Sequence, residues 1–299
     1  MRRNLFSFAA LALILAINSL AGIAAQGRKV APVIGNPADT TGLLRNPVNG
    51  MVLVLGGTFS MGSPAGEVGR STDEVQHEVS VSSFYIGVNE VTQAQYEVVM
   101  GTNSSNFKGG DLPVESVNWY NAVAFCNKLS EREGLPKVYA ISGTNVKANW
   151  NARGYRLPTE AEWEFAAKGG GAKGGGAKGG GGSDSLDVNA VYTGSASLND
   201  VAWHSGNSDK KTHPVGKKKA NALGSFDMSG NVWEWCWDVY GNYANGSQSD
   251  PKGASSGGDR VARGGSWLSA SQNLRSVGRG RCDPGSGRDT LGFRLARRP

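Results

Sequence analysis

Between residue 50 and about residue 168, the hydrophobic and polar positions first follow the period of β-strands and then that of helices. Apolar residues alternate or cluster over 51–55 and 58–62, on either side of Gly56 and Gly57, which predicts two short strands joined as a hairpin. The alternation over 79–90 predicts a further strand.

Helical spacing follows in three segments that carry start and stop signals. Thr92 and Thr159 each stand three residues before a Gln or Glu that can complete a capping box, at Gln95 and Glu162. Cys126 lies on the apolar stripe of the middle segment, so we expect a buried thiol. The predicted helices cover about 92–100, 119–133 and 159–168.

The second half of the chain has weaker periodicity. Trp233, Trp235 and Trp237 alternate, which predicts one face of a strand packed into the core. The stretch 268–290 mixes Ser, Gly, Arg and single apolar residues with neither a helical nor a strand period. We interpret it as ordered irregular surface, the kind of loop array that carries binding or catalysis on a rigid scaffold.

The N-terminus has the chemistry of a secretory signal peptide over 1–25. Arg2 and Arg3 precede an apolar run over 5–20, and small residues follow to a cleavage site near Ala24 or Ala25. The arginine pair leaves general secretion and twin-arginine export both open. We expect a polar leader over 26–49, no integral membrane domain after cleavage, and a periplasmic, surface or secreted location.

Composition indicates a globular domain rich in loops. The chain has 299 residues, of which 39% are hydrophobic and 44 are glycine, so it can bury a sizeable core with few long helices. The net charge of +6 arises from scattered basic residues and from a Gly/Lys-rich insertion over 169–185, without a nucleic-acid motif, so we expect no nucleic-acid partner. Three cysteines and three histidines, widely spaced, match no zinc site and allow at most one internal disulfide.

Six stretches in order resemble the formylglycine-generating enzyme, or sulfatase-modifying factor, family. The resemblance implies one α+β domain over 50–299 of the C-type-lectin-like kind, with few helices and much irregular structure. The stretches are 57–63 (GTFSMGS), 112–114 (LPV) with Trp119 after it, 155–164 (YRLPTEAEWE), 230–235 (GNVWEW), 263–267 (RGGSW) and 291–294 (LGFR).

The resemblance does not extend to the oxidase chemistry of the family. Its oxidases use two cysteines after the Gly-Gly-Ser-aromatic motif to bind copper, whereas Ser269 and Leu274 stand at the matching positions here. We therefore expect no copper and favour a protein that is not an enzyme. The alternative is a related oxidase or other enzyme that uses Cys282 or another group.

One metal site implied by the family is retained in the sequence. The resemblance places calcium on the carboxylates of Asp227 and Glu234 and on the backbone carbonyls of Gly230 and Val232, an all-oxygen set that a hard cation prefers. The alternative is that Asp227 caps a turn and Glu234 pairs with an arginine.

Part of the family resembles the variable target proteins of diversity-generating retroelements, which implies a variable binding region over 263–295. The predicted function is an exported ligand-binding protein whose C-terminal loops contact a protein or a glycan. We expect Trp267 to be buried as a brace, Arg294 to bind a buried carboxylate, and an exposed face from the loop residues. The predicted ligand-binding residues are Trp267, Leu268, Ser269, Ser271, Asn273, Gly278, Gly280, Arg281, Cys282 and Ser286.

Overall fold

The computed structural model describes residues 50–170 and 190–299. Both ranges belong to one compact unit. The predicted signal peptide, the leader and most of the Gly/Lys-rich insertion lie outside the described residues. Within the two described ranges, no helix combines the length and the apolar character needed to cross a membrane.

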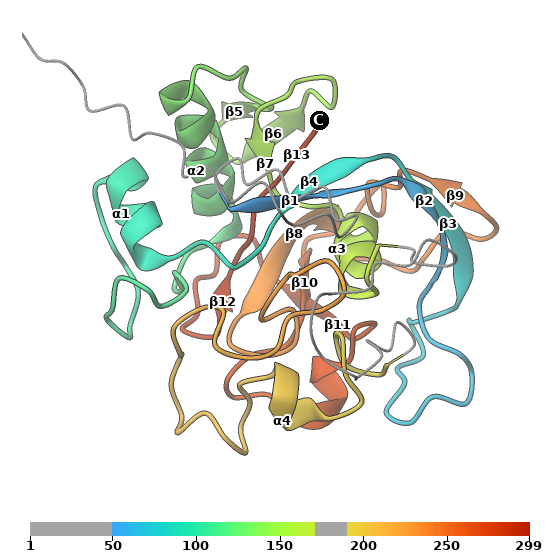
Figure 1. The fold of residues 1–299 in the computed structure, drawn as a ribbon. Coiled ribbons are helices and arrows are strands. Elements are labelled where there is room, and N and C mark those ends of the chain that lie inside the picture. The colour runs from blue at the N-terminus through green and yellow to red at the C-terminus, as the bar shows by residue number, and fades with distance from the viewer. Residues whose placement is uncertain (1–49, 171–189) are drawn as a thin grey trace, which may run out of the picture. The chain divides into compact units, whose positions relative to one another are not determined.

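Short elements separated by long irregular segments make up the described chain (Figure 1). In chain order they are β1 (Met51–Val54), β2 (Gly57–Met61), β3 (His77–Val81), β4 (Phe84–Gly87), α1 (Gln93–Met100), α2 (Trp119–Arg132), β5 (Tyr139–Ser142), β6 (Asn145–Ala148), β7 (Tyr155–Arg156), α3 (Glu160–Ala167), α4 (Leu198–Val201), β8 (Trp233–Val239), β9 (Gln248–Ser249), β10 (Arg260–Arg263), the 3-10 helix η1 (Ser271–Leu274), β11 (Arg279–Cys282), β12 (Leu291–Gly292) and β13 (Ala296–Arg297).

The described strands form four small sheets. Their orders are β1-β4-β13-β7, β11-β10-β8-β12, β2-β3-β9 and β5-β6. Helix α3 contacts β2 and β3 on one side and β8 and β10 on the other, while α2 packs against α1 and β7. The C-terminal strands β12 and β13 belong to two different sheets. The end of the chain therefore pairs with strands that come much earlier in the sequence, β8 in one sheet and β4 and β7 in the other.

The predicted hairpin between 51–55 and 58–62 is wrong. Strand β1 pairs with β4 and β2 pairs with β3, in one continuous antiparallel register that opposes Met51 to Gly87 and Met61 to His77. The ribbon bends between sheets at Gly56, where an added Cβ would stand 2.6 Å from the Val81 carbonyl oxygen. Gly56 therefore marks a close backbone approach within one long ribbon, and the predicted strand over 79–90 is divided at the same bend.

The three predicted helices are confirmed, with their caps. Thr92 and Thr159 each accept a hydrogen bond from the backbone N–H three residues on, and the Gln95 and Glu162 side chains return one to the cap residue's N–H. Gly101 ends α1 in the left-handed conformation, with φ of 79°.

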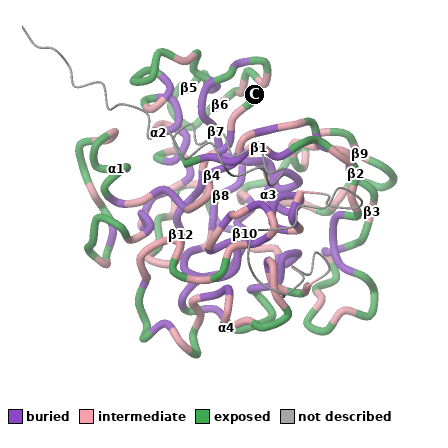
Figure 2. Tube along the Cα trace, viewed as in Figure 1, coloured by how far each residue is buried: buried purple, intermediate pink, exposed green. Residues whose placement is uncertain are grey.

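The core contains the predicted tryptophan strand (Figure 2). Trp235 is fully buried, and Trp233 and Trp237 pack against the same cluster. Cys126 is buried as predicted, and the three cysteines are all buried and free of disulfide bonds. Cys126 and Cys282 belong to this cluster, while Cys236 packs with Trp163 and Phe165 in the second cluster between α3 and the ribbon.

Arg294 binds a buried carboxylate, as the sequence predicted. Its guanidinium pairs with both oxygens of Glu234, at 2.5 Å from Nε and 2.6 Å from Nη2, and also donates to the carbonyl oxygens of Gly87 and Phe226. The Trp163 indole donates to the same carboxylate at 2.6 Å. All three side chains are fully buried, so one ion pair joins β8, β4 and the C-terminal segment.

Arg294→Met should lower the free energy of unfolding by about 3–5 kcal/mol, because it leaves the Glu234 carboxylate buried without its cation. Chemical denaturation at pH 7 measures this change. The matched control is Lys137→Met, which removes the cation of an exposed pair with Glu131 and should cost at most about 1 kcal/mol. Equal effects from the two variants would contradict the assignment of Arg294 as a structural tie.

Candidate functional site

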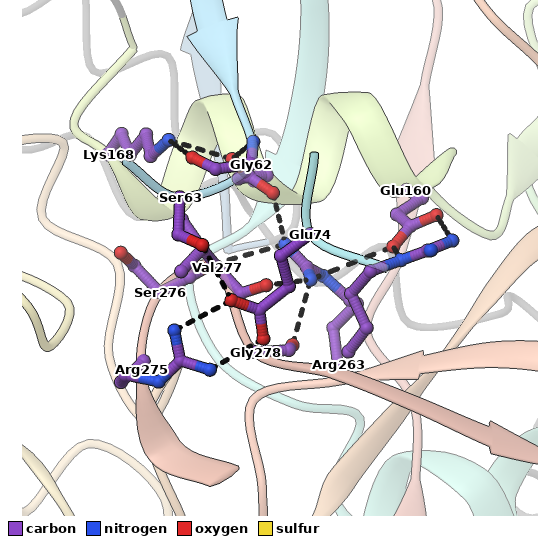
Figure 3. A network of polar contacts seen from close by, with 12 residues as sticks. Gly62, Ser63, Glu74, Glu160, Lys168, Arg263, Arg275, Ser276, Val277 and Gly278 are labelled. Carbon is purple, nitrogen blue, oxygen red and sulfur yellow. Dashed lines mark hydrogen bonds and ion pairs between the residues drawn. The ribbon is translucent and has the colours of Figure 1, made fainter. Parts of the chain in front are cut away.

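A buried arginine holds the irregular C-terminal segment against α3 (Figure 3). Arg263 is fully buried and donates to the carbonyl oxygens of Val277 and Gly278, both at 2.8 Å, and to that of Ser276 at 3.2 Å. The same guanidinium binds the Glu164 carboxylate at 2.6 Å. Burial raises the pKa of Glu164, but the charges of Lys168 and Arg263 outweigh burial and keep that pKa below its usual value. Arg263 therefore supplies hydrogen-bond donors to the backbone carbonyls of residues 276–278, which have no neighbouring strand to bind them.

Two more arginines fix the segment on the side of the 62–74 loop. Arg275 forms a bidentate pair with Glu74 at 2.5 and 2.8 Å and also binds Glu67 at 2.7 Å. Arg279 forms a bidentate pair with Glu160 at 2.7 and 2.9 Å. Both side chains are almost completely buried.

Trp267 braces the segment, as predicted. Its ring is 7% exposed, meets Phe107 edge to face, and donates from Nε1 to the Asp289 carbonyl oxygen at 3.0 Å. Its own carbonyl accepts a hydrogen bond from Ser208 Oγ at 2.8 Å. The indole therefore connects the two ends of the 268–290 stretch to the 103–116 and 204–208 loops.

The predicted ligand-binding residues divide by exposure. Leu268 is 58% exposed, and Ser271, Asn273 and Arg281 are also exposed. Gly280 and Ser286 are intermediate. We use the name C-terminal face for the four exposed residues Leu268, Ser271, Asn273 and Arg281.

Three of the predicted positions are not exposed loop positions, and this part of the prediction is wrong. Ser269 is buried because its hydroxyl accepts the Ser266 N–H at 3.0 Å inside the turn. The Gly278 backbone is buried over Arg263, and Cys282 is 6% exposed because its strand turns the thiol into the core. Gly280 is partly covered, since an added Cβ would stand 2.8 Å from the Trp233 ring.

The predicted calcium residues also divide into two groups. Both oxygens of Glu234 are engaged by Arg294 and Trp163, which is the arginine pairing that the sequence left as an alternative. Asp227 is different. Its Oδ2 accepts the Gly216 N–H at 2.6 Å, as in the turn-cap alternative, but its buried Oδ1 has no hydrogen-bond partner. Burial raises the pKa of Asp227 to about 6.

Glu90 is the carboxylate that the sequence analysis missed. It is 1% exposed and accepts hydrogen bonds from Asn231 Nδ2 at 2.9 Å and from the Val232 N–H at 3.2 Å, against the Gly-Asn-Val-Trp-Glu motif. Burial and the charges of Asp227 and Glu234 raise its pKa well above the usual value. In the sequence, Glu90 is distinguished only by its place at the end of the apolar pattern over 79–90. That position does not indicate which residues its carboxylate contacts.

Buried oxygen atoms therefore gather around Asp227. The neighbouring Asn89 Oδ1 is also buried without a partner. Within 50–170 and 190–299, however, no three His, Cys, Asp or Glu side chains are arranged to hold a metal ion. A cation here would need backbone carbonyl or amide oxygens beside the carboxylates.

Comparison with known proteins gives a consistent assignment. Residues 38–299 match the family model of the sulfatase-modifying factor enzyme 1-like domain. A chaperone protein LppX from Paenibacillus barcinonensis is 35% identical over 81% of this chain and 86% of its own length. The formylglycine-generating enzyme of Streptomyces coelicolor is 29% identical over 83% of this chain and 88% of its own length.

Among solved structures, the Treponema denticola variable protein 1 superimposes with a TM-score of 0.71. It is 37% identical and covers 83% of this chain and 95% of its own length. The motifs, the α+β architecture with much irregular structure and these matches agree, and the chain belongs to the family of sulfatase-modifying factor enzyme 1-like domains, whose members include the formylglycine-generating enzymes.

Proposed function

We propose that this protein is an exported ligand-binding protein that presents a variable C-terminal face on a fixed scaffold. The observation that carries the proposal is the division within one segment. Arg263, Arg275 and Trp267 hold its backbone through buried contacts, while Leu268 and the other residues of the C-terminal face stay exposed. Such a surface can change its side chains without changing its fold.

The C-terminal face has the chemistry of a recognition surface. It offers an apolar side chain at Leu268, a hydroxyl at Ser271, an amide at Asn273 and a guanidinium at Arg281. These groups suit a protein or a glycan ligand. Similarity to the Treponema denticola variable protein 1 supports a variable surface, and the signal-peptide pattern over 1–25 supports export.

Binding is also favoured over the oxidase chemistry of relatives. Ser269 and Leu274 occupy the positions of the oxidase cysteines; the serine hydroxyl is bonded within its turn and the leucine is fully buried. Cys282 is a poor substitute, because burial raises the pKa of its thiol and so disfavours the reactive thiolate.

The gene itself tests the proposal. Sequencing its 3′ end from many clones of the source population should show nucleotide differences concentrated in the codons of the C-terminal face, beside an adenine-rich near-copy of the same stretch. An invariant 3′ end without a near-copy would overturn the variable-surface proposal.

Substitutions in the segment should separate into two classes by burial. Leu268→Ala, Ser271→Ala and Asn273→Ala should change the free energy of unfolding by no more than about 0.5 kcal/mol, because these side chains are exposed. Ser269→Ala should cost about 1–2 kcal/mol through its lost hydrogen bond. Gly280→Ala should cost about 1–3 kcal/mol through overlap with Trp233.

Thermal and denaturant melts of all five variants, with Trp267→Ala as the reference for a core truncation, measure the separation. Trp267→Ala should cost about 3–5 kcal/mol. If the three alanine variants of the C-terminal face melt as early as Trp267→Ala, the segment is core and offers no free face.

We further propose that calcium binds at Asp227 and Glu90, with the Gly230 and Val232 carbonyls completing an oxygen set. The Asp227 Oδ1 atom, which is buried without a hydrogen-bond partner, supports this site. Glu234, a calcium ligand expected from the sequence, is left out of the proposed ligands because Arg294 binds its carboxylate. A divalent cation would offset the repulsion between two buried carboxylates.

Calcium should therefore raise the melting temperature relative to the chelated protein. At a concentration of one hundred times Kd the stabilisation is about 2.7 kcal/mol, or roughly 5–10 °C for a domain of this size. Asp227→Asn should lose the response, because it removes one of the two carboxylate charges. The variant should still fold, since asparagine also tolerates the left-handed backbone at this position, where φ is 56°.

Asp209→Asn is the matched control, because Asp209 is exposed and has a similar φ of 52°. It should keep the full calcium response. A chelated wild-type protein that melts at the same temperature as the calcium-treated one contradicts the site, and so does a response that survives Asp227→Asn.

A further inference from the structure

A pocket separate from the C-terminal face lies between two distant segments of the chain. The segments 72–77, except Glu74, and 242–246 line a cavity of about 420 Å³. Small-molecule sites occupy about 300–1,000 Å³, so this volume accommodates a ligand of one or two rings. None of its lining residues lies in the segment 263–295, so its chemistry does not depend on the variability proposed above.

Contacts with Arg279 fix the positions of Tyr243 and Asp73 in the pocket lining. The Tyr243 hydroxyl donates to Glu160 at 3.2 Å, and the Arg279 guanidinium, paired with the same carboxylate, lies 4.0 Å from the centre of the Tyr243 ring. Asp73 accepts the Tyr240 hydroxyl at 2.5 Å and pairs with Arg279 at 3.3 Å.

The opposite wall is also preformed. The Gln248 side chain donates to the carbonyl oxygens of Asn245 and Gly246, at 3.3 and 3.5 Å, and closes the 242–246 loop. Strand β9 then pairs in parallel with β3, which carries His77 at its start. The pocket therefore does not have to be ordered by its ligand.

The lining favours a neutral ligand. Burial raises the pKa of Asp73, but hydrogen bonds from Ser71 and Tyr240 and the charge of Arg279 outweigh burial and hold that pKa below its usual value. The negative charge of Asp73 is thereby already paired. The other polar lining groups, Thr72, Gln76, Asn242 and Asn245, are uncharged donors and acceptors.

The Tyr243 ring is already covered by His77 and by Arg279, so His77 is the ring that offers a ligand an apolar face and an oriented acceptor. The His77 and Tyr243 ring centres lie 4.6 Å apart at an interplanar angle of 43°. His77 Nδ1 lies 3.0 Å from the Val75 carbonyl oxygen, which can only accept, so Nδ1 carries the proton and Nε2 is the acceptor in the neutral ring. A ring face beside amides and a hydroxyl matches a ligand that has C–H faces and many hydroxyl groups.

We propose that this pocket is a fixed binding site for a neutral saccharide of one or two sugar rings. Asn242 and Asn245 bind sugar hydroxyls, and the His77 ring packs against the C–H face of a sugar ring. The protein thus has a constant sugar site that shares no residue with its C-terminal face.

Saturation-transfer NMR and calorimetry on the purified protein test the site with glucose, galactose, mannose and N-acetylglucosamine, and with a β-1,4-linked dimer of each. At least one of these sugars should receive saturation from the protein. Asn245→Ala and Asn242→Ala should each weaken its binding about three- to tenfold, the effect of one neutral hydrogen bond.

Asn273→Ala is the matched control, since it removes the same exposed amide from the C-terminal face. It should leave sugar binding unchanged, and melting curves should show all three variants folded. The proposal is overturned if no sugar in the panel receives saturation, or if Asn273→Ala weakens binding as much as Asn245→Ala. The second result would place the sugar on the C-terminal face and would support the proposed function while removing this pocket from it.

Discussion

The buried pair between Arg263 and Glu164 is the contact on which the irregular half of the structure depends. Buried backbone carbonyls need hydrogen-bond donors, and the backbone over 276–278 has no neighbouring strand to supply them. A guanidinium offers five N–H groups in a fixed plane, so one side chain can satisfy several carbonyls at once. Its charge must then be balanced where no water reaches, and α3 provides Glu164 for that purpose. Arg294 and Glu234 repeat this solution across the core.

Local signals in the sequence were sufficient for the helices and insufficient for the strand pairing. The capping residues Thr92 and Thr159 act within four residues, so their chemistry can be read directly from the chain. The partner of β1 lies about thirty residues away, and the Gly56-Gly57 pair is equally compatible with a turn and with a close crossing of two strands. Only the packed structure distinguishes the two.

The candidate site shows the same limit. The motifs located the segment that carries the C-terminal face, and Trp267 and Arg294 have the predicted roles. Glu90 was missed because it meets Asn231 of the Gly-Asn-Val-Trp-Glu motif only in the folded chain, where 141 positions separate the two residues. The exposure of Ser269 and Cys282 was misjudged because a loop without periodicity gives no indication of which side chains turn inward.

The exposure pattern of the 268–290 stretch has a consequence for how such a protein evolves. Most proteins lie just above a stability threshold, so random change usually removes more variants through misfolding than it offers as new functions. A diversifying process aimed at exposed positions such as Leu268 and Asn273 avoids that loss, because those side chains contribute little to folding. The buried Ser269 and Cys282 in the same stretch act as fixed points, so a series of mutations could change the exposed side chains without first acquiring compensating stability.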